Sequence, residues 1–193
     1  MSTVRRVESG PMLIDRSKER LFNLIIYYVK NTRFCYKTKL LKLLYFSDFL
    51  HFKIAGKAIT ALTYSTWEKG PVPVELYREI DKPGEELKKY VAIRRDDTKV
   101  MFEPLKEFDP MLFSKRELAL IGQIAKSFYK TDSNDMVEST HLKNHPWDLT
   151  MNTYGANHKI DYRLALDGSE DCIRPEKHRE IESDKRLIKR IFS

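Results

Sequence analysis

The sequence predicts a predominantly helical α+β fold, compact around one apolar central helix and completed by a small β-element, a strand plus a hairpin. The central helix is predicted for residues 37–55, where apolar side chains recur around most of the helix circumference. The β-element is predicted from the β-branched and aromatic residues of 63–67 and from a second β-prone region at 90–102. A chain of 193 residues that is 41% hydrophobic is long enough to form one domain with a sizeable core.

The N-terminal half contains three predicted helices and one strand. Residues 16–30 carry apolar side chains at three- and four-residue spacing after a candidate N-cap, Asp15. The central helix of 37–55 is expected to end at Gly56, because glycine is the common residue just after a helix. The strand of 63–67 is followed by residues 70–73, which we interpret as a tight turn, and then by a helix that begins at Pro73.

The C-terminal half is predicted to contain a hairpin followed by two helices. Residues 90–93 and 99–102 flank a polar link and predict the hairpin. Ser114 and Glu117 have the spacing of a capping box at the start of a helix, and a further helix starts after Thr131 or Asp132, covers His141 and stops before Pro146. Residues 152–171 are polar, with a weak tendency to an edge strand.

We divide the chain into an arm of residues 1–15, a body of residues 16–170 and a charged C-terminal helix of residues 171–193. The last helix has a thin apolar stripe, so it either docks on the body or contacts a partner, including a second copy of the chain. The N-terminus lacks the apolar stretch of a signal peptide, and no apolar run reaches the length of a membrane span. With only two cysteines, which are not paired for metal or redox work, a cytoplasmic location is expected.

Basic residues are concentrated around the central helix. Between residues 30 and 57 the only acid is Asp48, whereas Lys37, Lys39 and Lys42 lie in the first turns of the helix, where the helix dipole disfavours positive charge. Two explanations remain open: an anionic partner surface, or solvation and pairing with acids of neighbouring elements. A nucleic-acid regulator that uses these lysines is an alternative, but it is disfavoured because no recognition-helix or RNA-binding motif accompanies the charge.

Asp48, the lone acid of this segment, lies three residues before His51 on the same helix face. It fits a poised acid or base or a charged contact for a partner, but we favour a face that meets solvent or pairs with a nearby lysine. Trp67 and Trp147 are interpreted as core anchors rather than binding hot spots.

Catalytic, cofactor and metal sites are not predicted. His141 and His145 are four residues apart, but Leu142 stands where a zinc hydrolase would have its glutamate, so a polar helix end is favoured over a metal site. The glycines form no phosphate-binding loop, and no activated serine or cysteine pattern is present.

Several of these residues together resemble the signature of the Panacea domain, also called SocA-like. The resemblance rests on the run from Lys42 to Phe49, on residues 64–67, on the Gly-Pro turn and on a later segment with His and Trp. The residues that we assign to the structural motif are Leu43, Leu44, Tyr45, Phe46, Gly70, Pro71 and Pro73.

The resemblance implies an antitoxin of bacteria or phages that neutralises a cognate protein toxin by direct binding, and in one branch of the family an adaptor that delivers the toxin to a protease. The segment before the first helix is too short for the N-terminal DNA-binding part that some members carry. On these grounds we predict a non-enzymatic protein with these candidate partner-binding residues: Lys37, Lys39, Lys42, Asp48, His51, Trp67, Glu68, Tyr77, His141 and Trp147.

Overall fold

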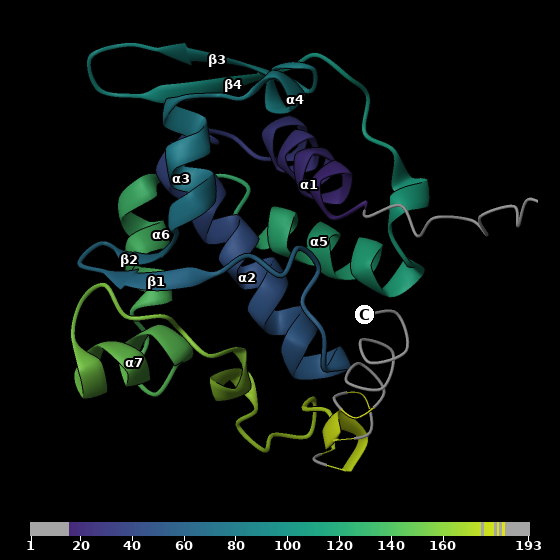
Figure 1. Ribbon diagram of the computed structural model, residues 1–193, viewed down its shortest axis with the longest axis vertical. Helices are drawn as coiled ribbons and strands as arrows, with labels where there is room; N and C mark the ends of the chain where they lie inside the picture. Colours follow the sequence, from purple (N-terminus) through teal and green to yellow (C-terminus); the bar gives the residue numbers. More distant parts are fainter. Residues whose placement is uncertain (1–15, 175, 180, 182, 184–193) are drawn as a thin grey trace, which may run out of the picture.

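Helix α2 (Lys37–Ala55) runs through the middle of the protein, and the other elements pack around it (Figure 1). The computed structural model describes residues 16–174, 176–179, 181 and 183. Leucines and aromatic residues of α2 are buried on several sides of the helix, as its apolar circumference predicted. The helix ends at Gly56, which has φ +67° and allows the left-handed turn expected there.

The remaining helices confirm a predominantly helical α+β fold. They are α1 (Ser17–Asn31), α3 (Val74–Asp81), α4 (Glu85–Lys88), α5 (Lys115–Ser127), α6 (Ser133–Thr140) and α7 (Pro146–Tyr154), with short 3₁₀ helices η1 (Pro110–Leu112) and η2 (Tyr162–Ala165). Ser114 and Glu117 form both hydrogen bonds of the predicted capping box, and Asp132 caps α6. The largest cluster of buried apolar residues joins α1, α2 and α5, and a smaller cluster joins α2 to Trp147 and η2.

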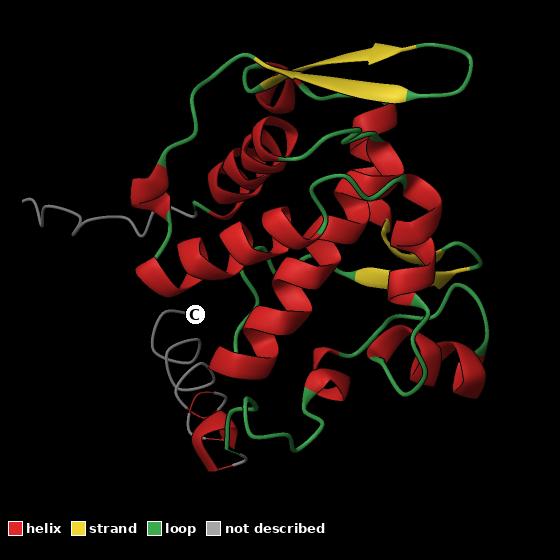
Figure 2. Cartoon of the chain, turned by 180° about the vertical axis from the view of Figure 1, so that it is seen from behind, coloured by secondary structure: helices red, strands yellow, loops and turns green. Residues whose placement is uncertain are grey.

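Two antiparallel ribbons complete the fold, as seen from the other side in Figure 2. Strand β1 (Tyr64–Trp67) pairs with β2 (Gly70–Pro73), and β3 (Val91–Arg95) pairs with β4 (Val100–Pro104). The expectation that residues 70–73 form a turn is wrong, because they form β2 and the turn lies at Glu68 and Lys69. In a two-stranded ribbon both strands are edge strands, so prolines that lack an N–H group are tolerated.

Three other expectations for the C-terminal half need correction. Helix α6 ends at Thr140, so His141 follows the helix. The preceding helix stops before Pro146 as predicted, but α7, which Pro146 opens, was not expected; a proline needs no N–H partner in the first turn of a helix. Residues 162–165 form η2 rather than an edge strand. Asp15, the arm of residues 1–15 and most of the predicted C-terminal helix lie outside the described residues.

Replacing Gly70 by alanine is expected to lower the free energy of unfolding by about 3 kcal/mol. Gly70 has φ +92°, and a Cβ atom there would lie 2.6 Å from Thr140 Oγ1 and 2.7 Å from Lys42 Nζ. Gly168 also has a positive φ, +73°, but a Cβ atom there would have no neighbour within 4 Å. Gly168→Ala should therefore cost only the backbone strain, about 1 kcal/mol. Urea unfolding measures both, and equal losses would contradict the packing argument.

Candidate partner-binding site

Several charged side chains of α2 are buried and bind segments outside the helix. Lys39 is fully buried, and its Nζ donates to the carbonyl oxygens of Arg33, Thr131 and Tyr129 at 2.7, 2.8 and 3.3 Å. Lys42 is also buried, and its Nζ donates to the carbonyl of Pro71 at 2.9 Å. These bonds tie α2 to the loops beside α1, α5 and β2.

The three lysines at the start of α2 therefore do not form an exposed basic patch. Lys37 pairs with Asp81 at 2.6 Å, which is the pairing with a neighbouring acid that the sequence left open. Among the described residues, Lys39 and Lys42 neither form an anionic partner contact nor pair with an acid, because backbone carbonyl oxygens accept the hydrogen bonds of their Nζ atoms. The nucleic-acid alternative loses its proposed contact residues for the same reason.

Asp48 and His51 lie in the core, which corrects the expectation of a face in contact with solvent or paired with lysine. Asp48 is fully buried and accepts hydrogen bonds from the Thr60 N–H at 2.6 Å, the Thr60 hydroxyl at 2.5 Å and the Tyr64 hydroxyl at 3.0 Å. Burial raises the pKa of Asp48, although these hydrogen bonds act in the opposite direction. His51 Nδ1 lies 2.7 Å from the carbonyl oxygen of Lys57.

The β1–β2 turn is supported from behind by His141 and Trp147. Their rings stack at a centroid distance of 3.9 Å, and Trp147 Nε1 donates to the carbonyl of Trp67 at 3.2 Å. Trp147 is 8% exposed, as expected for a core anchor. His141 Nε2 is buried without a hydrogen-bond partner and, like Lys42 Nζ, lies close to Gly70.

On the outer side of this turn lies a cavity of about 560 Å³, which we call the Trp67 cavity. Lys37 Nζ lies 3.2 Å from the centre of the Tyr77 ring, and the rings of Trp67 and Tyr77 are 4.9 Å apart. Trp67 and Tyr77 are half-buried, while Glu68 is exposed at the rim. The full lining consists of Lys37, Thr38, Leu41, Lys42, Trp67, Glu68, Lys69, Val72, Tyr77, Ala156 and Asn157.

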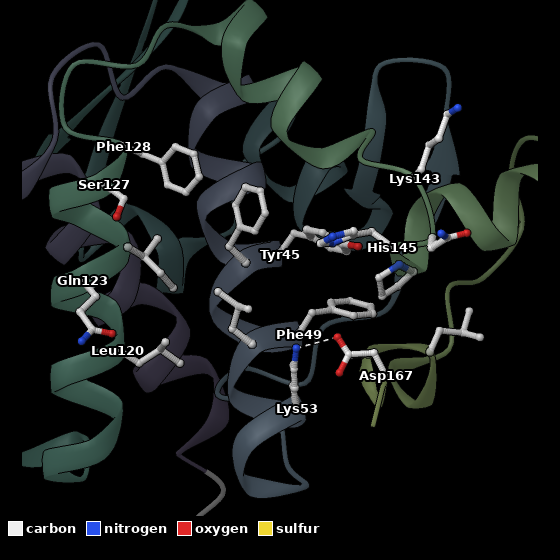
Figure 3. Close-up of a pocket in the computed structure, with 17 residues that line it drawn as sticks. Tyr45, Phe49, Lys53, Leu120, Gln123, Ser127, Phe128, Lys143, His145 and Asp167 are labelled. Carbon is white, nitrogen blue, oxygen red and sulfur yellow. Dashed lines mark hydrogen bonds and ion pairs between the residues drawn. The ribbon is translucent and has the colours of Figure 1, made fainter. Parts of the chain in front are cut away.

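A second cavity, of about 520 Å³, lies between α2 and α5 and is closed on its other side by the segment before α7 and by η2. We call it the α2–α5 groove. Figure 3 shows Gln123 and Phe128 on its α5 wall, Phe49 on α2, and His145 and Asp167 on the opposite side. Its floor is mainly apolar and aromatic.

The structure thus brings together five of the ten predicted residues in the Trp67 cavity, namely Lys37, Lys42, Trp67, Glu68 and Tyr77. His141 and Trp147 lie behind the cavity, and Lys39, Asp48 and His51 serve other parts of the core. Sequence reasoning missed Thr38, Lys69 and Asn157 of the cavity and the whole α2–α5 groove. Only the groove left a signal, the i, i+3, i+4, i+7 row that begins at Phe46.

His141 and His145 do not converge on a common site. His141 stacks on Trp147, whereas His145 precedes α7 and lines the groove. Within the described residues, no group of three or more His, Cys, Asp or Glu side chains could hold a metal ion. The helices of that part also include none with the length and apolar character to cross a membrane.

The contribution of Lys42 to the stability of the protein is expected to rise between pH 7 and pH 10. Burial lowers the pKa of Lys42 to about 7, well below the usual lysine value of about 10.4. Between these pKa values the unfolded chain binds a proton that the folded protein does not, so raising the pH favours the folded state. Lys42→Met should lack this rise.

Urea unfolding of the wild type and of Lys42→Met at several pH values between 6 and 10 measures the effect. The difference between the two free energies of unfolding should change in favour of the wild type as the pH rises. Parallel curves would show that Lys42 keeps an ordinary pKa. The pKa of His141 is lowered by burial and by nearby Lys42, so its own effect on stability is complete above the ordinary histidine value of about 6.5.

Comparison with known proteins gives one family. Residues 40–148, more than half of the chain, match the family described as antitoxin SocA-like, Panacea domain. The matched span contains most of α2, the β1–β2 ribbon and the stacked His141 and Trp147. No curated protein and no solved structure matched the chain. The chain belongs to the SocA-like Panacea domain family, and this membership supports an antitoxin role.

Proposed function

We propose that the protein is a cytoplasmic antitoxin that neutralises a cognate protein toxin by direct binding, with the Trp67 cavity as a principal contact surface. The observation that carries this assignment is the Trp67–Tyr77–Lys37 cluster, which joins β1, α3 and α2 at an open cavity. Family membership supplies the antitoxin role, and the cluster supplies a surface for the contact.

The chemistry of the cavity suits a protein partner. Tryptophan and tyrosine are enriched among the residues that dominate binding energy, because they bury a large area with few rotatable bonds. Here both rings have contacts before binding: Lys37 lies over the Tyr77 ring, and the Trp67 ring packs against Tyr77 with centroids 4.9 Å apart. A preorganised surface loses little side-chain entropy on association. Glu68 and Lys69 at the rim supply charges that orient a partner.

Co-expression with the product of an adjacent gene tests the function itself. That product should arrest growth when it is expressed alone and should be harmless together with this protein. The two purified proteins should form a complex. If no neighbouring gene product is toxic alone and relieved by this protein, the proposed function fails.

Trp67→Ala is expected to weaken binding of the toxin by at least about tenfold, because truncation of a central aromatic contact removes more than about 1 kcal/mol of binding energy. Tyr154→Ala is the matched control, since Tyr154 is 65% exposed and lies outside both cavities. Titration calorimetry compares the two, and circular dichroism verifies that both variants are folded. Equal affinities would place the contact elsewhere.

A further inference from the structure

Two rows of side chains, one from α2 and one from α5, line the α2–α5 groove in a way that suits a helical ligand. Helix α2 contributes residues 46, 49, 50 and 53, and α5 contributes residues 120, 123, 124 and 127. Each set has the spacing i, i+3, i+4, i+7, which means that one continuous face of each helix points into the groove. Such rows form the ridges against which a third helix packs.

The floor of the groove is apolar and partly open to solvent. Phe46 and Phe128 stack with their ring centres 5.0 Å apart, and Phe49 stacks on Tyr162 at 4.5 Å. Leu50 and Leu164, on opposite sides, remain 38% and 36% exposed. Exposed leucines beside an aromatic floor mark a surface that is stabilised when an apolar partner covers it.

The charge at the rim specifies the partner further. Asp167 is the acid of the lining, and it is neutralised by Lys53 at 2.7 Å. Lys143 is exposed at the upper rim in Figure 3 and has no ion-pair partner among the described residues. In the described part of the chain, the groove therefore keeps one uncompensated positive charge, that of Lys143, and this charge favours a ligand that carries a carboxylate.

We propose that the α2–α5 groove binds an amphipathic α-helix of the toxin, with apolar residues at i, i+3, i+4 and i+7 facing Phe49 and Leu50 and an acidic residue facing Lys143. The groove volume of about 520 Å³ is within the range of pockets that enclose several side chains. This helix-in-groove mode needs no sheet edge, and two walls of the groove are formed by helices α2 and α5. The inference rests on the proposed function only in assigning the helix to the toxin.

The test uses the full chain and a fluorescent synthetic peptide of about four helical turns, with leucines on one face and glutamates on the other. A second peptide carries lysines in place of the glutamates. Fluorescence anisotropy should show saturable binding of the acidic peptide and binding at least about tenfold weaker for the basic one.

Variants of the groove make the test specific. Leu50→Glu should weaken binding of the acidic peptide about tenfold, whereas Leu105→Glu, at a leucine that is 56% exposed outside the groove, should not. Ser127→Arg obstructs the groove from the α5 wall and serves as a second variant if Leu50→Glu does not fold. Lys143→Glu should reverse the preference toward the basic peptide, with Lys89→Glu as its control.

Absence of saturable binding by either peptide would overturn the inference. So would binding that is unchanged by both Leu50→Glu and Ser127→Arg, or a charge preference that Lys143→Glu leaves unaltered. These outcomes leave the proposed function intact if the wild type still neutralises its toxin. Conversely, peptide binding without any neutralised toxin would retain the groove as a helix-binding site and reject the antitoxin assignment.

Discussion

The structure depends on one constraint: α2 is buried along most of its length, yet it carries cationic and anionic side chains that must find partners inside the protein. An unsatisfied buried polar group costs about 1–3 kcal/mol, and more when it is charged. Each group therefore fixes a segment from elsewhere in the chain. Lys39 donates hydrogen bonds to the loops at Arg33 and Thr131, and Lys42 donates one to Pro71. Asp48 accepts hydrogen bonds from Thr60 and Tyr64. The loops around α2 are placed as much by these bonds as by apolar packing.

The β1–β2 turn shows how this constraint shapes the Trp67 cavity that we propose as a contact surface. Lys42 donates to the Pro71 carbonyl of β2, and Trp147 donates to the Trp67 carbonyl at the end of β1. Gly70, just after the turn, leaves room for Lys42 and for the His141 ring that stacks on Trp147. Because the backbone of the turn is fixed from behind, its outer side chains can keep a defined arrangement without a partner. The residues that fix the turn from behind all lie within the span that matches the family. Glu68 and Lys69, at the tip of the turn, are exposed to solvent.

The sequence predicted the elements better than the site because the two depend on different information. Apolar periodicity and caps are local, so α2, α5 and the β3–β4 ribbon were found close to their observed bounds. The contacts of Lys39 and Asp48 join residues far apart in the chain, and no local pattern encodes them. One inference was nevertheless available. A helix that is apolar around most of its circumference is surrounded by protein, so its lysines had to be buried as well. The sequence could not reveal which carbonyls would receive them.

The burial of these lysines changes what the positive charge of the chain means. The net charge of +7 counts Lys37, Lys39 and Lys42 as cations, yet one is paired with Asp81 and two are enclosed by carbonyls or by the core. Steering of an acidic partner depends on charges that reach solvent. Lys69 beside the Trp67 cavity and Lys143 beside the α2–α5 groove meet that condition. The segment from His141 to Trp147 connects the two places, since both of its ends lie behind the β1–β2 turn and its middle lines the groove. If the proposed helix of the toxin occupies the groove, it contacts the same short segment that supports Trp67, so the two proposed contacts share one stretch of chain.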